Sequence, residues 1–134
     1  MAFKMPALAA DCVVFDRVGR LLLIRRAKAP FKGAYALPGG FVEYGEPVEA
    51  AALRELKEET GVECKIVRLI GVYSDPERDP RGHTVSTAFL VRPRSTKVVG
   101  GDDASEAAFV SDWREVKLAF DHAKIVADAL KLRA

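Results

Sequence analysis

Residues 40–62 read GFVEYGEPVEAAALRELKEETGV, and this stretch decides the fold. Its second half predicts a helix from about Pro47 to Thr60. Proline suits the first turn of a helix, and glycine at position 61 suits a left-handed cap that ends one. Leu53 and Leu56 stand three residues apart, so they can anchor one side of the helix in a core.

Three glutamates of this stretch, Glu55, Glu58 and Glu59, stand at positions i, i+3 and i+4 and therefore share one side of the predicted helix. Like charges so close together repel one another unless a cation lies among them. Ligands that offer only oxygen suit a hard ion, Mg²⁺ or Mn²⁺, which normally works together with substrate phosphates. The spacing therefore predicts a metal site.

The full pattern is Gly40-x5-Glu46-x7-Arg54-Glu55-Leu56-x-Glu58-Glu59-x-Gly61-Val62, which fixes nine positions. It matches the Nudix box without a departure, so the chain resembles the Nudix hydrolase family. The resemblance implies an α/β/α sandwich with a mixed β-sheet. It also implies that Glu55, Glu58 and Glu59 bind the metal, joined by the backbone carbonyl of Gly39.

The whole chain predicts one domain over residues 1–134. It has 134 residues, of which 49% are hydrophobic and 30% charged, and a net charge of +2. That charge is too small to favour a nucleic acid or membrane partner. The N-terminus lacks the form of a secretion signal, and Cys12 and Cys64 are expected to be buried thiols in a reducing cytoplasm.

Outside the box the pattern predicts strands mixed with two helices, which is typical of an α/β or α+β sandwich. Two apolar runs around the turn at residues 16–19 predict a hairpin, and Asp121 is placed to cap the last helix. The predicted strands are residues 10–15, 21–25, 35–37, 62–73, 84–91 and 107–111.

Further catalytic residues are expected around the glutamate trio. The resemblance implies that Glu46 and Arg54 mainly orient one another and the catalytic glutamates, although a direct role in catalysis stays open. Many Nudix enzymes take another carboxylate from a later loop. The candidates here are Asp102, Asp103 and Glu106, of which we favour Glu106.

The substrate is predicted from a separate segment, YSDPERDPRGH at residues 73–83. Many Nudix ADP-ribose pyrophosphatases carry a similar segment. Two prolines stiffen it, arginines suit bidentate phosphate contacts, and a tyrosine can stack on a base or ribose. The predicted substrate-binding residues are Arg25, Arg26, Tyr73, Arg78, Arg81 and His83.

Three functions follow in order of preference. The first is metal-dependent hydrolysis of ADP-ribose to AMP and ribose 5-phosphate, with Mg²⁺ or Mn²⁺. The second is a nucleoside triphosphate pyrophosphohydrolase. The third, from another class, is a sensor that binds an ADP-ribose-like ligand without turnover. Nudix domains of this size are frequently homodimers, so a homodimer is expected.

Overall fold

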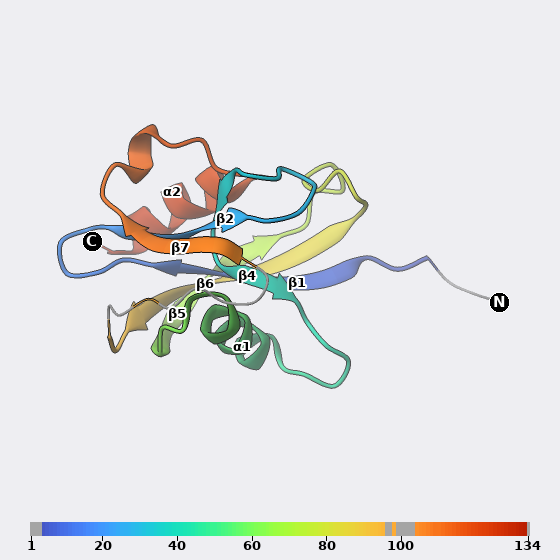
Figure 1. Cartoon of the computed structure of the whole chain (residues 1–134). Helices are drawn as coiled ribbons and strands as arrows, with labels where there is room; N and C mark the ends of the chain where they lie inside the picture. The colour runs from blue at the N-terminus through green and yellow to red at the C-terminus, as the bar shows by residue number, and fades with distance from the viewer. Residues whose placement is uncertain (1–3, 96–97, 99–103, 134) are drawn as a thin grey trace.

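The computed structural model describes residues 4–95, 98 and 104–133, and its strands form two layers between two helices (Figure 1). Within these residues, seven strands, two α-helices and one short 3₁₀ helix follow one another. In order they are β1 (Ala7–Val14), β2 (Leu21–Arg26), β3 (Tyr35–Ala36), β4 (Gly39–Phe41), α1 (Val48–Thr60), β5 (Cys64–Tyr73), β6 (Thr84–Pro93), β7 (Ala104–Val110), η1 (Trp113–Glu115) and α2 (His122–Arg133).

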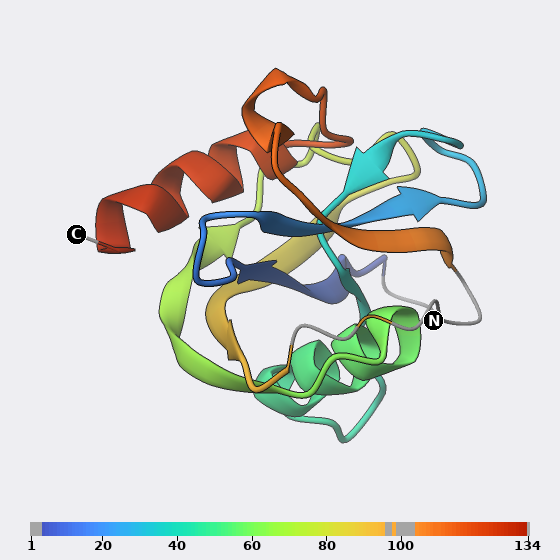
Figure 2. The ribbon, with the colours of Figure 1, turned by 60° about the vertical axis from the view of Figure 1, so that its left-hand side comes forward.

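The strands divide into a mixed sheet of four, in the order β4-β1-β6-β5, and an antiparallel sheet of three, in the order β3-β2-β7. In the first sheet β1 runs parallel to β6 and antiparallel to β4. Figure 2 shows α1 and α2 on opposite sides of the strands. The predicted α/β/α sandwich with a mixed sheet is therefore confirmed.

Helix α1 begins after Pro47 and ends at Gly61, as the sequence predicts. Gly61 has a φ of 72°, a left-handed conformation that glycine adopts without strain, and its amide donates to the carbonyl of Lys57. Leu56 is fully buried and fastens the helix to the core. The helix is therefore fixed in rotation, and the side that carries the glutamates faces β4.

Each helix packs on its own hydrophobic cluster. The cluster under α1 includes Cys12, Leu22 and Phe89, and the cluster under α2 includes Val13, Leu23 and Trp113. Successive residues of a strand point to opposite faces, so β1 and β2 each contribute to both clusters. No helix in the described part of the chain is long and apolar enough to span a membrane.

The hairpin predicted around residues 16–19 is only partly correct. The turn exists, because the Asp16 carboxylate accepts hydrogen bonds from the amides of Val18 and Arg20. The strands on either side of it separate, however, and β1 and β2 belong to different sheets. Only the bridge between Phe15 and Leu21 joins them in the described structure, because β1 finds its partners in β4 and β6.

Candidate active site

Two consecutive glycines of β4 have no space for side chains, Gly40 because of the carboxylate side of α1 and Gly39 because of β1. A Cβ on Gly40 would lie 2.5 Å from the carboxyl carbon of Glu55. A Cβ on Gly39 would overlap the carbonyl oxygen of Ala10 and the carboxylate of Asp11 on β1. Bare backbone at 40 therefore allows the helix carboxylates to approach the sheet, and bare backbone at 39 allows β4 to lie close to β1.

Arg54 is the centre of the charge network on this side of α1. Its Nε and Nη2 donate to both carboxylate oxygens of Glu46, at 2.8 and 3.0 Å. Its Nη1 donates to Glu55 at 2.8 Å and to Glu58 at 3.3 Å, and its Nη2 also reaches the carbonyl of Phe41. The hydrogen bond from Arg54 is the main cause that lowers the pKa of Glu46 to about 2. Arg54 thus holds Glu46 and two members of the glutamate trio in one network.

The three glutamates differ in their surroundings. The Glu58 side chain is 51% exposed, whereas Glu59 is 4% exposed and accepts a hydrogen bond from the Gly39 amide at 2.9 Å. Within the described ranges, no three His, Cys, Asp or Glu side chains are gathered closely enough to hold a metal ion. The donors have the oxygen chemistry that a hard divalent ion requires. Because Arg54 contacts both Glu55 and Glu58, these side chains must rotate to share an ion, and their metal role stays a prediction.

Substituting Arg54 with methionine is expected to lower the melting temperature by several degrees at pH 7. The depressed pKa of Glu46 contributes stability that is fully present above its ordinary value of 4.5 and is lost as pH falls toward 2. The difference between wild type and variant should therefore shrink between pH 4.5 and 2 in thermal unfolding. Arg54→Lys keeps the charge without the planar fork and should fall between the two. A difference that does not change with pH would contradict this role of the pair.

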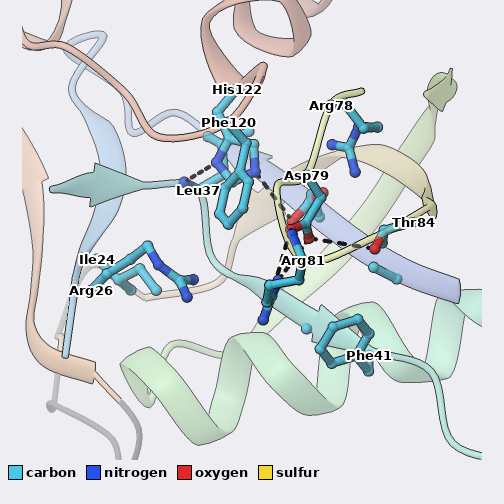
Figure 3. A pocket seen from close by; sticks show the side chains of 14 residues that line it. Ile24, Arg26, Leu37, Phe41, Arg78, Asp79, Arg81, Thr84, Phe120 and His122 are labelled. Carbon is cyan, nitrogen blue, oxygen red and sulfur yellow. Dashed lines mark hydrogen bonds and ion pairs between the residues drawn. The ribbon is translucent and has the colours of Figure 1, made fainter. Parts of the chain in front are cut away.

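A pocket opens beside Gly39 and Gly40, on the side of β4 where arginines and aromatic rings gather (Figure 3). It draws its walls from β1, β2, β4, β6 and the segments before β6 and α2. The residues that line it are Ala9, Asp11, Ile24, Arg26, Leu37, Gly39, Gly40, Phe41, Arg78, Asp79, Arg81, Thr84, Phe120 and His122.

Asp79 holds the side chain of Arg81 at the mouth of this pocket. Its buried carboxylate accepts hydrogen bonds from Nε and Nη2 of Arg81 at 3.1 and 2.8 Å, and from the Thr84 hydroxyl at 3.4 Å. Burial alone would raise the pKa of Asp79, but the hydrogen bonds from Arg81 outweigh burial and the pKa is lowered. The carboxylate therefore stays ionised and keeps its hold on Arg81.

Polar side chains that contact one another form the base of the pocket. The Ser86 hydroxyl donates to Asp11, and the other oxygen of Asp11 lies 3.8 Å from Nε2 of His122. Nδ1 of His122 accepts from the Leu37 amide at 3.0 Å, so the neutral ring carries its proton on Nε2. Burial lowers the pKa of His122, which agrees with a neutral ring. His122 thus links α2 to the chain just before β4.

Arg78 lies deeper than Arg81 and is held by Asp121. Its Nε and Nη2 donate to the two carboxylate oxygens of Asp121 at 2.9 and 2.6 Å. Asp121 stands immediately before α2, where a cap was predicted, and its carbonyl accepts from the amides of Lys124 and Ile125. The pair ties the loop before β6 to the start of α2.

The structure brings Gly39, Arg26, Arg78 and Arg81 to the pocket, but it places other predicted site residues elsewhere. Arg25 contacts Tyr35 and lies 3.7 Å from Glu106, so these two predicted residues face each other on the antiparallel sheet. His83 is exposed and bonds the carbonyl of Ser74. Asp102 and Asp103 lie outside the described residues.

The position of Tyr73 does not suit the predicted stacking on a base or ribose. Its ring belongs to the core cluster under α2 and is 8% exposed, and its hydroxyl donates to Asp128 at 2.7 Å. The alternation of a strand explains the error, because the last residue of β5 turns inward to α2. We therefore leave Tyr73 out of the proposed site.

Several residues of the pocket were not identified from the sequence as part of a site, among them Asp11, Phe41, Asp79 and Phe120. Phe120 lines the pocket, whereas Trp113 is buried in the core. A signal existed for Asp11, since a lone carboxylate inside an apolar strand needs a buried polar partner. Phe41 directly follows the two glycines of the box, but nothing in its sequence context distinguishes it from a core residue.

Comparison with known proteins identifies the family. A NUDIX domain model matches residues 5–131. An ADP-ribose pyrophosphatase of Methanocaldococcus jannaschii is 50% identical over 94% of this chain and 74% of its own length. An ADPR-responsive transcriptional repressor of Acinetobacter baylyi is 30% identical over 95% of this chain, which spans 54% of that protein.

Solved structures agree with this assignment. The NUDIX domain of Shewanella oneidensis NrtR, solved in complex with ADP-ribose, is 28% identical and superimposes with a TM-score of 0.90 over 98% of this chain and 91% of that one. A MutT/nudix family protein from Enterococcus faecalis gives a TM-score of 0.86 at 30% identity, over 98% of this chain and 63% of that chain. With a family match that spans nearly its whole length, this chain belongs to the Nudix family.

Proposed function

We propose that this protein hydrolyses the diphosphate linkage of ADP-ribose, giving AMP and ribose 5-phosphate, with the help of a divalent metal ion. One observation carries the proposal. The carboxylate side of α1 and the arginine-bearing pocket meet at the same two glycines, Gly39 and Gly40. A diphosphate placed there has metal-binding oxygens on one side and guanidinium groups on the other.

Nudix hydrolases generally use divalent metal ions. We propose Mg²⁺, with Mn²⁺ as a substitute, held by Glu55, Glu58, Glu59 and the carbonyl of Gly39. A bound ion shields the phosphate charge and acidifies an attacking water. Glu46 and Arg54 hold the trio in position, since Arg54 contacts both Glu55 and Glu58. One carboxylate of the trio accepts the proton of the water.

The substrate follows from similarity and from the arginines of the pocket. The relative that is 50% identical is an ADP-ribose pyrophosphatase, and a domain of the same fold was solved with ADP-ribose. Arg26 and Arg81 reach the pocket with planar, permanently charged groups that suit phosphate oxygens. Arg78 is already paired with Asp121 and supports the loop rather than the ligand.

A sensor is the second candidate, because an ADPR-responsive transcriptional repressor is among the similar proteins. A sensor binds its ligand without turning it over. The intact glutamate trio favours the enzyme, since a binding module has no need for it. We further propose a cytoplasmic homodimer, which the family resemblance implies.

A panel of ADP-ribose, NADH, nucleoside triphosphates and dinucleoside polyphosphates, assayed with Mg²⁺ and with Mn²⁺, tests the proposal. The highest kcat/KM is expected for ADP-ribose, with AMP and ribose 5-phosphate as products by chromatography. Activity should disappear with a chelator and return with the metal. Preference for a nucleoside triphosphate would reject ADP-ribose as the substrate. Tight binding of ADP-ribose without turnover would establish the sensor.

A further inference from the structure

At the mouth of the pocket the guanidinium of Arg81 lies between the rings of Phe41 and Phe120, and the space that it takes is called the slot here. The guanidinium carbon of Arg81 lies 5.1 Å from the centroid of one ring and 5.7 Å from the other. Figure 3 shows Arg81 between the two labelled rings. Because a guanidinium is itself planar, the space that it takes between two aromatic rings suits another planar group.

Phe120 is held as a fixed wall of this slot. Its backbone has a φ of 53°, a left-handed conformation that is costly for a bulky residue and persists only where the surroundings impose it. Phe31, with a φ of 60°, packs edge-on against the Phe120 ring at 4.9 Å. The guanidinium of Arg26 lies 5.0 Å from the centre of the same ring. Two strained residues in mutual contact at a pocket mouth indicate a position selected for a ligand.

Phe41 forms the opposite wall and connects the slot to the carboxylate side of α1. It is 46% exposed, and it follows Gly40 directly. Its carbonyl accepts from Nη2 of Arg54, the same side chain that contacts Glu55. A group in the slot therefore lies next to the proposed site of bond cleavage.

Arg81 can leave the slot without leaving a buried charge unsatisfied. Its own side chain is 44% exposed, but the Asp79 side chain with which it pairs is only 3% exposed, so moving the guanidinium away breaks a half-buried ion pair. The Asp79 carboxylate keeps the amide of Arg81 at 2.9 Å and the hydroxyl of Thr84 as donors when the guanidinium departs. For Arg81 to move, a phosphate oxygen has to replace Asp79 as the partner of the guanidinium, and a base stacked on the two rings adds to the gain.

We propose that the slot between Phe41 and Phe120 binds the planar base of the nucleotide, and that Arg81 moves out of it to contact a phosphate. The proposal rests on the proposed function only in requiring a nucleotide ligand. It makes Phe41 and Phe120 specificity-determining residues, because a phosphorylated sugar without a base gains nothing from the slot.

The test uses the fluorescent 1,N⁶-etheno analogue of ADP-ribose with the metal chelated, so that binding is measured without turnover. Stacking quenches the etheno base, and wild-type protein should quench it. Phe41→Leu and Phe120→Leu should each weaken binding about tenfold and reduce the quenching at saturation. Tyr44→Leu is the matched control, since Tyr44 is 107% exposed on the neighbouring loop, and it should change neither quantity.

Arg81→Ala tests the role of Arg81 separately from that of the two phenylalanine rings. The variant should bind more weakly, because a phosphate contact is lost, but should quench fully at saturation. Three results would overturn the proposal that the slot binds the base. They are a wild-type protein that does not quench the fluorescence, loss of quenching in Arg81→Ala, and wild-type quenching in both phenylalanine variants. If Phe120→Leu fails to fold by circular dichroism, Phe41→Leu decides, because its exposed position does not hold the core.

Turnover of unmodified ADP-ribose, measured in parallel, distinguishes the two proposals. Turnover with an unchanged KM in both phenylalanine variants rejects the slot and leaves the proposed function intact. Quenching that Phe41→Leu removes, in a protein that does not hydrolyse ADP-ribose, supports the slot and rejects the proposed function.

Discussion

Glu58→Gln is expected to lower kcat for ADP-ribose by roughly 10²–10⁴-fold, while the fold remains intact. The substitution keeps the size of the side chain and removes its charge, which both a metal ligand and a proton acceptor require. Glu58 is half-exposed, and its only hydrogen bond in the described structure is the 3.3 Å contact with Arg54. Stability should therefore change little, and the loss should appear in turnover.

The matched control for this variant is Glu49→Gln, an exposed carboxylate in the first turn of the same helix. It removes one negative charge from α1 but lies away from the Arg54 network. Both variants should melt within a few degrees of wild type, and only Glu58→Gln should lose activity. Titrating Mg²⁺ adds a second measurement, since a lost ligand raises the concentration of metal needed for half-maximal rate. Near wild-type turnover in Glu58→Gln would remove the trio from the mechanism.

The helix that carries this site was predictable because its signals are local. Pro47 at the start, Gly61 at the end and the buried Leu56 lie within one stretch, and each acts through neighbours a few residues away. The pairing of β1 with β6 was not predictable in the same way. It joins Ala7 to Thr84 and continues for eight residues, and nothing near β1 indicates which distant strand it meets.

The candidate site also has a part that local sequence predicts and a part that depends on distant segments. The network of Arg54 with Glu46, Glu55 and Glu58 lies within residues 46–58, all inside the box. The pocket, in contrast, collects residues from five elements and their loops. The prediction that both Arg25 and Arg26 bind the substrate could have been narrowed to one of them. Adjacent residues of a strand point to opposite faces, so only one of them could reach the pocket, and it is Arg26.

The second large effect is expected from Gly40→Ala, which should separate activity from stability. The new Cβ would lie 2.5 Å from the carboxyl carbon of Glu55 and 2.6 and 2.8 Å from its oxygens. That carboxylate ends a flexible side chain, so it can move aside at little cost to the fold. It then leaves its place beside Arg54 and the other glutamates. A displacement of about 1 Å at a catalytic group can lower turnover about 10²-fold, which is the expected loss.

Gly39→Ala provides the contrast, because its Cβ would meet backbone. The closest atoms are the carbonyl oxygen of Ala10 and the side chain and Cα of Asp11, the last at 2.9 Å. The backbone of β1 is fixed by its pairing with β6 and cannot yield as a side chain can. Overpacking of this kind costs about 1–3 kcal/mol, so Gly39→Ala should lower both stability and turnover. Thermal unfolding and kcat, measured on both variants, give the test. Equal destabilisation by the two substitutions would mean that Glu55 is held as rigidly as the sheet, and this would contradict the rotation that its metal role requires.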